Sequence, residues 1–268
     1  MAEGAGGGAA EATANLVEVF SSVQGEGPAV GRSTLFVRFG ECDLRCRWCD
    51  SPGTWLPAHE ARLERGRGSG RFVSEPNPLP LARVVAACEA LELASHRFVA
   101  LTGGEPLLQP EAVLALARAL AGRGPRIFLE THGLAEPALS RVLEAVDVIS
   151  MDWKLTSDVR RRGDPRHGAV APFHEAHERF LRTAHAGAEV SVKLVVTPRS
   201  RDAELEEALS RIARVDPTIP VILQPVTPAG PVRDRPTPER MLELEARFSH
   251  TLADVRVVPQ THPIWGAR

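Results

Sequence analysis

Residues 34–50 read TLFVRFGECDLRCRWCD, in which an apolar, strand-like run is followed by three cysteines. Cys42, Cys46 and Cys49 have the spacing C-x3-C-x2-C. Thiolates are soft ligands that favour zinc, copper(I) and iron–sulfur clusters, but a structural zinc site takes four protein ligands and this stretch supplies three. Three thiolates on a four-iron cluster leave one iron open to a further ligand. The spacing therefore predicts an iron–sulfur cluster, with zinc or a redox-active thiol as the alternatives.

The composition indicates a globular cytoplasmic protein. The 268 residues carry a formal net charge of −2 with both signs mixed, so there is no basic tract for nucleic acid. No apolar run is long enough to span a membrane. Residues 1–14 are small and glycine-rich without the pattern of a signal peptide, which predicts a disordered tail. Grouped cysteines indicate metal chemistry rather than disulfides, and Cys88, in an apolar run, is expected to be a buried hydrophobe.

Alternation of strands and helices predicts the fold class. Six strands, beginning near residues 34, 97, 126, 147, 189 and 219, each lead into a helix or a polar loop, a pattern typical of parallel sheets with right-handed crossovers. Six repeats are too few for a closed eight-fold barrel, so we predict an α/β fold with a partial, open (β/α)6 barrel; a doubly wound sheet is the alternative. An edge strand at 15–20 and a short strand at 255–258 complete one domain over 15–268. Residues 52–77 lack an apolar period and are interpreted as an insertion or a partly ordered loop.

Polar residues follow several of these strands, where such folds build their sites. Thr102-Gly103-Gly104-Glu105-Pro106 follows the second strand, and its glycines would let the backbone approach a ligand; a tight strand–helix turn is the alternative. Lys154 and Lys193 are the only lysines among 32 basic residues, and both are expected to contact a ligand as point charges. The pair His174 and His177 is interpreted as a solvated helix face.

With Trp48 before the third cysteine, the triad resembles the cluster loop of radical S-adenosylmethionine (SAM) enzymes. The resemblance implies a [4Fe-4S] cluster whose open iron binds SAM, and a 5′-deoxyadenosyl radical formed in an enclosed site. A closer resemblance, to the 7-carboxy-7-deazaguanine synthase family, extends from about residue 15 to the C-terminus. It is carried by residues 22–27 (SVQGEG), 31–32, 36–39, 49–51, 130–133, 150–154, 193–196, 224–225 and 259–262, with Trp265 and Gly266.

This resemblance implies a radical SAM lyase that converts 6-carboxy-5,6,7,8-tetrahydropterin to 7-carboxy-7-deazaguanine with loss of ammonia, for queuosine and related 7-deazapurines. It implies a homodimer, a Mg²⁺ ion and an electron donor such as flavodoxin. Two alternatives stay open at this point. An activating enzyme for a glycyl-radical protein would not need the polar residues before the cluster loop, and a non-catalytic iron–sulfur electron-transfer protein would not need the Gly103-Gly104 loop.

The resemblance also assigns roles to residues. Arg38 suits bidentate capture of the substrate carboxylate, and Ser51 stands where the family usually has a threonine that coordinates Mg²⁺. His132 stands where the family commonly has asparagine. The implied substrate-binding residues are Val23, Gln24, Gly25, Glu26, Arg38 and Thr102. The implied SAM-binding residues are Trp48, Asp50, Gly103, Gly104, Glu105, Asp152, Trp153, Lys154 and Gln224. The metal ligands are Cys42, Cys46, Cys49 and Ser51, and the candidate catalytic residues are Lys154 and His262.

Overall fold

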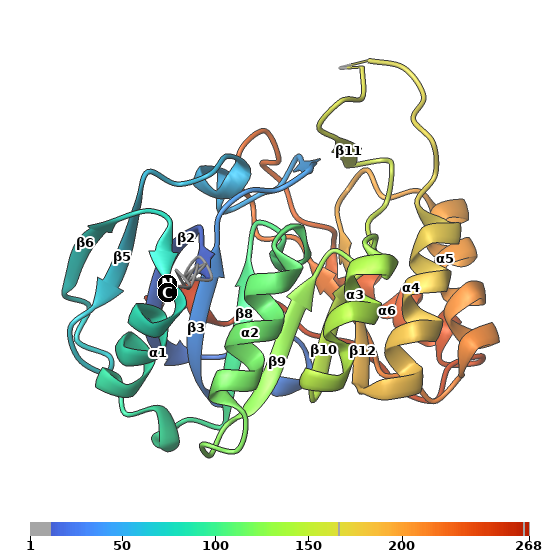
Figure 1. Cartoon of the computed structure of the whole chain (residues 1–268). Helices are drawn as coiled ribbons and strands as arrows, with labels where there is room; N and C mark the ends of the chain where they lie inside the picture. Colours follow the sequence, from blue (N-terminus) through green and yellow to red (C-terminus); the bar gives the residue numbers. More distant parts are fainter. Residues whose placement is uncertain (1–11, 166, 265, 268) are drawn as a thin grey trace, which may run out of the picture.

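A ten-stranded, mostly parallel sheet forms the centre of the molecule (Figure 1). The computed structural model describes residues 12–165, 167–264 and 266–267. The strand order is β14-β13-β12-β10-β9-β8-β3-β2-β5-β6. In chain order these strands are β2 (Leu16–Val23), β3 (Ser33–Phe39), β5 (Glu60–Glu64), β6 (Phe72–Pro76), β8 (Phe98–Gly103), β9 (Arg126–Thr131), β10 (Val148–Asp152), β12 (Glu189–Val196), β13 (Val221–Pro225) and β14 (Val255–Val257).

The predicted strand–helix alternation is confirmed. From β3 to β14 the neighbouring strands are all parallel, and the six predicted strands lie next to one another in chain order. β6 and β14 stand at opposite ends of the strand order and are not paired with each other in the described part of the chain, so the barrel is open. The helices are α1 (Leu81–Ala90), α2 (Pro110–Leu120), α3 (Glu136–Val142), α4 (His174–Gly187), α5 (Asp202–Val215) and α6 (Pro238–Phe248).

Burial explains why these segments form these elements. β8 has the nearly continuous apolar sequence FVALTG, as expected for a parallel strand covered on both faces. In α2 the buried Val113, Leu116, Ala117 and Leu120 recur at helical spacing and pack into the main core. The hydroxyl of Thr237 accepts a hydrogen bond from the Arg240 N–H and caps α6.

The N-terminal third differs from the sequence-based prediction. β2 is not an edge strand, because residues 52–77 add two strands beyond it: β5 runs parallel to β2, and β6 pairs antiparallel with β5. A short 3-10 helix, η2 (Pro52–Trp55), precedes them. Residues 1–11 lie outside the described residues, whereas β1 (Thr13–Ala14) pairs with β7 (Leu79–Pro80). The predicted disordered tail, residues 1–14, therefore wrongly includes Thr13 and Ala14, which form a strand.

A small separate sheet holds the cysteine loop. β4 (Leu44–Cys46) pairs antiparallel with β11 (Val159–Arg161), so that Cys46 lies opposite Val159. The pairing continues at both ends: Arg47 N–H donates to the Asp158 carbonyl at 3.0 Å, and Arg162 N–H donates to the Asp43 carbonyl at 2.6 Å. The sequence after residue 154 has no clear periodic pattern, yet this segment braces the loop that carries the thiols.

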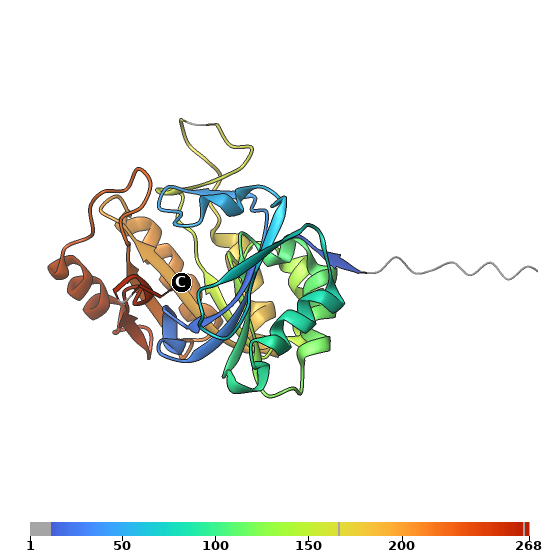
Figure 2. The same cartoon turned by 90° about the vertical axis from the view of Figure 1, so that its left-hand side faces the viewer.

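The C-terminal segment of the described chain packs against the loop that follows β2. Thr261 N–H donates to the Gly25 carbonyl at 2.9 Å, which places the C-terminal segment beside the loop after β2 (Figure 2). Within the described residues, none of the helices has the length and apolar character needed to cross a membrane.

Candidate functional site

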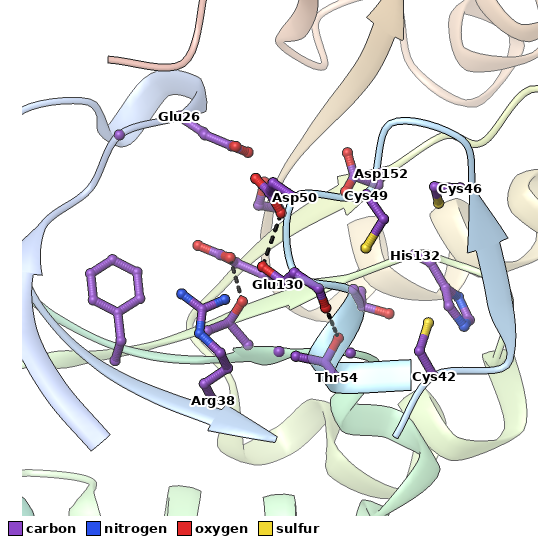
Figure 3. Close-up of a pocket in the computed structure, with 18 of the residues that line it drawn as sticks. Glu26, Arg38, Cys42, Cys46, Cys49, Asp50, Thr54, Glu130, His132 and Asp152 are labelled. Carbon is purple, nitrogen blue, oxygen red and sulfur yellow. Dashed lines mark hydrogen bonds between the residues drawn. The ribbon is translucent and has the colours of Figure 1, made fainter. Parts of the chain in front are cut away.

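A cavity of about 580 Å³ lies where the parallel strands end, a volume typical of small-molecule sites. It is bounded by the cysteine loop, by the loops after β8, β9 and β10, and by the C-terminal segment (Figure 3). Most residues predicted from the sequence line it together. They are Val23, Gln24, Gly25, Glu26, Arg38, Cys42, Cys46, Trp48, Cys49, Asp50, Ser51, Thr102, Gly103, Gly104, Asp152, Lys154, Gln224 and His262.

The three predicted cysteine ligands share one side of this cavity, near His132 (Figure 3). All three are free thiols, whereas the fourth cysteine, Cys88, is buried in α1 as predicted. Burial raises the pKa of the Cys42 thiol to about 11 and that of the Cys46 thiol to about 12. A metal that binds thiolates must displace these protons and supply positive charge in their place. Three free thiols on one braced loop, all lining the same cavity, are the donor set of a [4Fe-4S] cluster with one open iron.

The glycines after β8 allow the loop to pack directly on the cysteine loop. Gly103 has φ +132°, and a Cβ there would collide with the backbone of Phe39. A Cβ on Gly104 would collide with the Glu41 carbonyl, to which the next residue, Glu105, donates its N–H at 2.9 Å. These contacts explain why a side chain is absent at both positions.

Two predicted SAM-contacting residues do not line the cavity. The Glu105 side chain is fully buried and accepts hydrogen bonds from Leu107 N–H (3.0 Å), Thr131 Oγ1 (2.8 Å) and His132 N–H (2.8 Å). Its carboxylate therefore ties the β8 and β9 loops together behind the cavity wall. Trp153 is 1% exposed, and its indole N–H donates to His174 Nδ1 at 3.1 Å.

Both lysines of the chain line the cavity and share one carboxylate. Asp152 lies 2.9 Å from the Lys154 ammonium and 3.3 Å from that of Lys193, and Glu26 pairs with Lys193 from the other side. Burial opposes charge on Lys193, but Asp152 and Glu26 outweigh it and raise the pKa of the ammonium. For Lys154, the Asp152 charge likewise outweighs burial and raises the pKa. Both lysines thus hold fixed positive charge, and Lys154 lies 4.7 Å from the Trp48 ring centroid.

Glu130, at the end of β9, joins the residues predicted to bind substrate. Its carboxylate accepts from Gln24 Nε2 and from Thr102 Oγ1, each at 2.6 Å. Burial, and then the nearby Glu26 charge, raise the pKa of this carboxyl. Arg38 lies near this group (Figure 3), and its Nε donates to Glu18 Oε1 at 3.1 Å.

Glu130 and His132 were not among the predicted site residues, although Glu130 lies at the end of a strand that the alternation predicts and His132 directly follows it. Their place at that strand's carboxyl end was the signal that could have identified them. Arg62 and Gln260 also line the cavity, and they come from segments without a periodic pattern. Gln260 Nε2 donates to Asp50 Oδ2 at 3.2 Å. Trp265, part of the C-terminal resemblance, lies outside the described residues.

The histidine pair on α4 is buried, so the predicted solvated face is wrong. His177 is 0% exposed; its Nδ1–H donates to the Gly133 carbonyl at 2.9 Å, and its Nε2 accepts from Lys154 N–H at 2.9 Å. His174 accepts from the Trp153 indole. Both ring nitrogens of His177 bond to backbone groups, so His177 fixes the backbone of the loops after β9 and β10, on which Lys154 depends.

These contacts predict a pH-dependent contribution of His177 to stability. Burial lowers its pKa well below 6.5, so below pH 6.5 the unfolded chain binds a proton that the folded chain does not. The free energy of unfolding should then fall with decreasing pH by about 1.4 kcal/mol per unit from this group. His177→Gln should lower stability at pH 8 by about 2–4 kcal/mol and remove this slope.

Urea unfolding of the metal-free protein between pH 5 and pH 8 measures both effects. His250→Gln, at an exposed histidine beyond α6, should leave the slope as in the unmodified protein. Equal slopes in the unmodified protein and His177→Gln would contradict the assignment.

Comparison with known proteins agrees with this geometry. Residues 37–212 match the model of the Radical SAM superfamily. A 7-carboxy-7-deazaguanine synthase of Geobacter sulfurreducens is 38% identical over 257 residues, covering 94% of this chain and 97% of the relative. One of Methanopyrus kandleri is 36% identical, covering 93% of this chain and 92% of the relative. The crystal structure of QueE from Escherichia coli is similar in fold, with a TM-score of 0.59 at 22% identity, covering 93% of this chain and 95% of that one. The chain therefore belongs to the radical SAM superfamily and, within it, to the family of 7-carboxy-7-deazaguanine synthases.

Proposed function

We propose that this chain converts 6-carboxy-5,6,7,8-tetrahydropterin to 7-carboxy-7-deazaguanine with loss of ammonia. The observation that supports this most is the composition of the cavity. The cluster thiols lie on one side of the cavity, and Arg38 and Glu130, to which Gln24 is hydrogen-bonded, lie on the other (Figure 3). An activating enzyme or a simple electron-transfer protein would have no use for this second, polar group.

The polar group matches the chemistry of a carboxylated pterin. Glu18 orients the Arg38 guanidinium, whose terminal nitrogens have the fork geometry that binds a carboxylate. Glu26 and Glu130 can accept hydrogen bonds from the amino and ring N–H groups of a pterin. Donors from such a ring would also relieve the unfavourable burial of the Glu130 carboxylate.

Cys42, Cys46 and Cys49 would hold a [4Fe-4S] cluster, which together with SAM would supply the one-electron chemistry of the reaction. The protein's part is to bind and to exclude water. Gly103 and Gly104 bring backbone close to the cluster loop, and Lys154 and Asp152 place opposite charges at the cavity wall. We assign Lys154 an electrostatic role, because its raised pKa keeps it charged. We assign His262, which packs on Gly25, the candidate proton-transfer role.

A magnesium ion is proposed beside the substrate. Ser51 Oγ donates to Asp50 Oδ1 at 2.9 Å, so a hydroxyl and a carboxylate, both hard oxygen ligands, lie together at the cavity. Ser51→Ala should abolish the stimulation of turnover by Mg²⁺, whereas Ser51→Thr should retain it. Equal stimulation in Ser51→Ala would exclude this residue as a ligand.

Anaerobic reconstitution, followed by incubation with SAM, dithionite and the carboxytetrahydropterin, tests the activity directly. Formation of the deazaguanine with SAM regenerated is the expected result. An intact cluster without deazaguanine would contradict the proposal, and deoxyadenosine release without pterin turnover would favour an activating enzyme. Replacing dithionite with reduced flavodoxin in the same assay tests the proposed donor. The predicted homodimer stays a prediction, which sedimentation equilibrium can test.

A further inference from the structure

The strand pair β5–β6, for which the sequence suggested no role, contributes an arginine to the cavity. Arg62 of β5 lines it together with Glu18 of β2 and Arg38 of β3. Glu18 is opposite Arg38 in the β2–β3 pairing and opposite Arg62 in the β2–β5 pairing. Residues opposite each other on adjacent strands lie side by side on the same face of the sheet. The three therefore form a row across three strands, which we call the Arg62–Glu18–Arg38 row.

Contacts restrain both ends of this row. Glu18 is 8% exposed; its Oε1 lies 3.1 Å from Arg38 Nε, and its Oε2 lies 4.0 Å from an Arg62 terminal nitrogen. The Arg62 guanidinium lies 4.5 Å from the Phe72 ring centroid, and that of Arg38 lies 5.5 Å from the Phe20 ring centroid. An aromatic face below each cation limits where it can move. The Arg62 side chain is 43% exposed against 21% for Arg38, so Arg62 stands nearer to solvent.

The charges of the row are unbalanced. Within the row, two guanidinium groups flank a single carboxylate; the other carboxylates of the cavity, those of Glu26, Asp50, Glu130 and Asp152, belong to other elements. A ligand carboxylate beside Arg38 would balance the second positive charge of the row, and its negative charge would be attracted by both arginines. A ligand without a carboxylate would gain nothing from the second arginine.

We propose that Arg62 is a specificity-determining residue that selects pterins bearing a carboxylate. The proposal rests on the proposed function, since it concerns the same substrate cavity. It gives residues 52–77 a role: they carry the second of two cations that recognise the carboxylate, the first being Arg38.

Binding of two fluorescent oxidised pterins, 6-carboxypterin and unsubstituted pterin, to the cluster-loaded protein tests the proposal by fluorescence quenching. Arg62→Gln should weaken 6-carboxypterin binding about tenfold, as expected for a lost charge-assisted contact, and change pterin binding less than twofold. Arg71→Gln removes the same charge from an exposed position in the turn just before β6 and should alter neither. In turnover assays, KM for the carboxytetrahydropterin should rise more than kcat falls in Arg62→Gln.

The outcomes separate this inference from the proposed function. Equal weakening of both pterins in Arg62→Gln would make the residue a structural partner of Glu18 and overturn the inference, as would unchanged binding of 6-carboxypterin. In either case the unmodified protein would still convert the carboxytetrahydropterin. Lack of conversion by the unmodified, cluster-loaded protein would instead refute the proposed function and the inference with it.

Discussion

Cys46→Ala should hold no [4Fe-4S] cluster after anaerobic reconstitution and should not cleave SAM. Cys46 is the middle ligand of the triad and the one whose backbone lies in β4, opposite Val159 of β11. Its loss leaves two thiols, and the cluster then lacks ligands at two irons rather than one. Iron and sulfide analysis, together with visible absorption of the reconstituted protein, measures the outcome without depending on turnover.

Cys88→Ala is the matched control for this prediction. Cys88 is 0% exposed within α1 and does not line the cavity. The control should bind iron as the unmodified protein does, and it should lose about 1 kcal/mol of stability from a small packing defect. Normal iron content in Cys46→Ala, or loss of iron in Cys88→Ala, would contradict the assignment of the ligands.

The second large effect is expected for Arg38→Ala. This variant should weaken binding of the carboxytetrahydropterin by about 2–3 kcal/mol, because a charged hydrogen-bonding partner of its carboxylate is lost and Glu18 is left without its 3.1 Å partner. Cleavage of SAM in the absence of pterin should stay detectable. Arg38→Lys should recover only part of the loss, because an ammonium cannot form the two parallel hydrogen bonds of a guanidinium.

Equilibrium binding and KM for the carboxytetrahydropterin measure the effect, with iron content as the check on folding. Arg179→Ala, at an exposed arginine of α4, removes the same charge away from the cavity and should behave as the unmodified protein. If Arg38→Ala lost the cluster as well, Arg38 would be a structural residue of the cluster loop, and its assignment to the substrate carboxylate would fail.

The sequence predicted features that depend on local pattern. The strands of the parallel sheet were recognisable because burial on both faces requires long apolar runs, and the cluster ligands because their spacing is short. The pairing of β5 with β2 could not be recognised from a local pattern. The segment EARLE at Glu60–Glu64 carries three charges in five residues and therefore does not resemble a buried strand. The strand it pairs with lies about 40 residues earlier in the chain. Arg62 could not be placed in the cavity without that pairing.

Burial of polar side chains was the other feature that pattern could not show. Glu105 and His177 belong to polar-looking stretches, yet both are 0% exposed, with each side chain hydrogen-bonded to backbone groups of neighbouring loops. A polar side chain of this kind can be buried because it forms hydrogen bonds with backbone N–H and C=O groups that would otherwise be buried without a partner. Its partners lie in loops that only the folded sheet brings together.

The pairing of β4 with β11 has a consequence for the order of assembly. Leu44–Cys46 obtains its hydrogen-bonding partner from a strand roughly 110 residues further along the chain, a contact that a growing chain can form only late. The thiol loop can therefore be braced only after residues 159–161 have been synthesised. A truncated chain that ends before Val159 lacks the strand that pairs with the thiol loop, and we expect it to hold a cluster poorly.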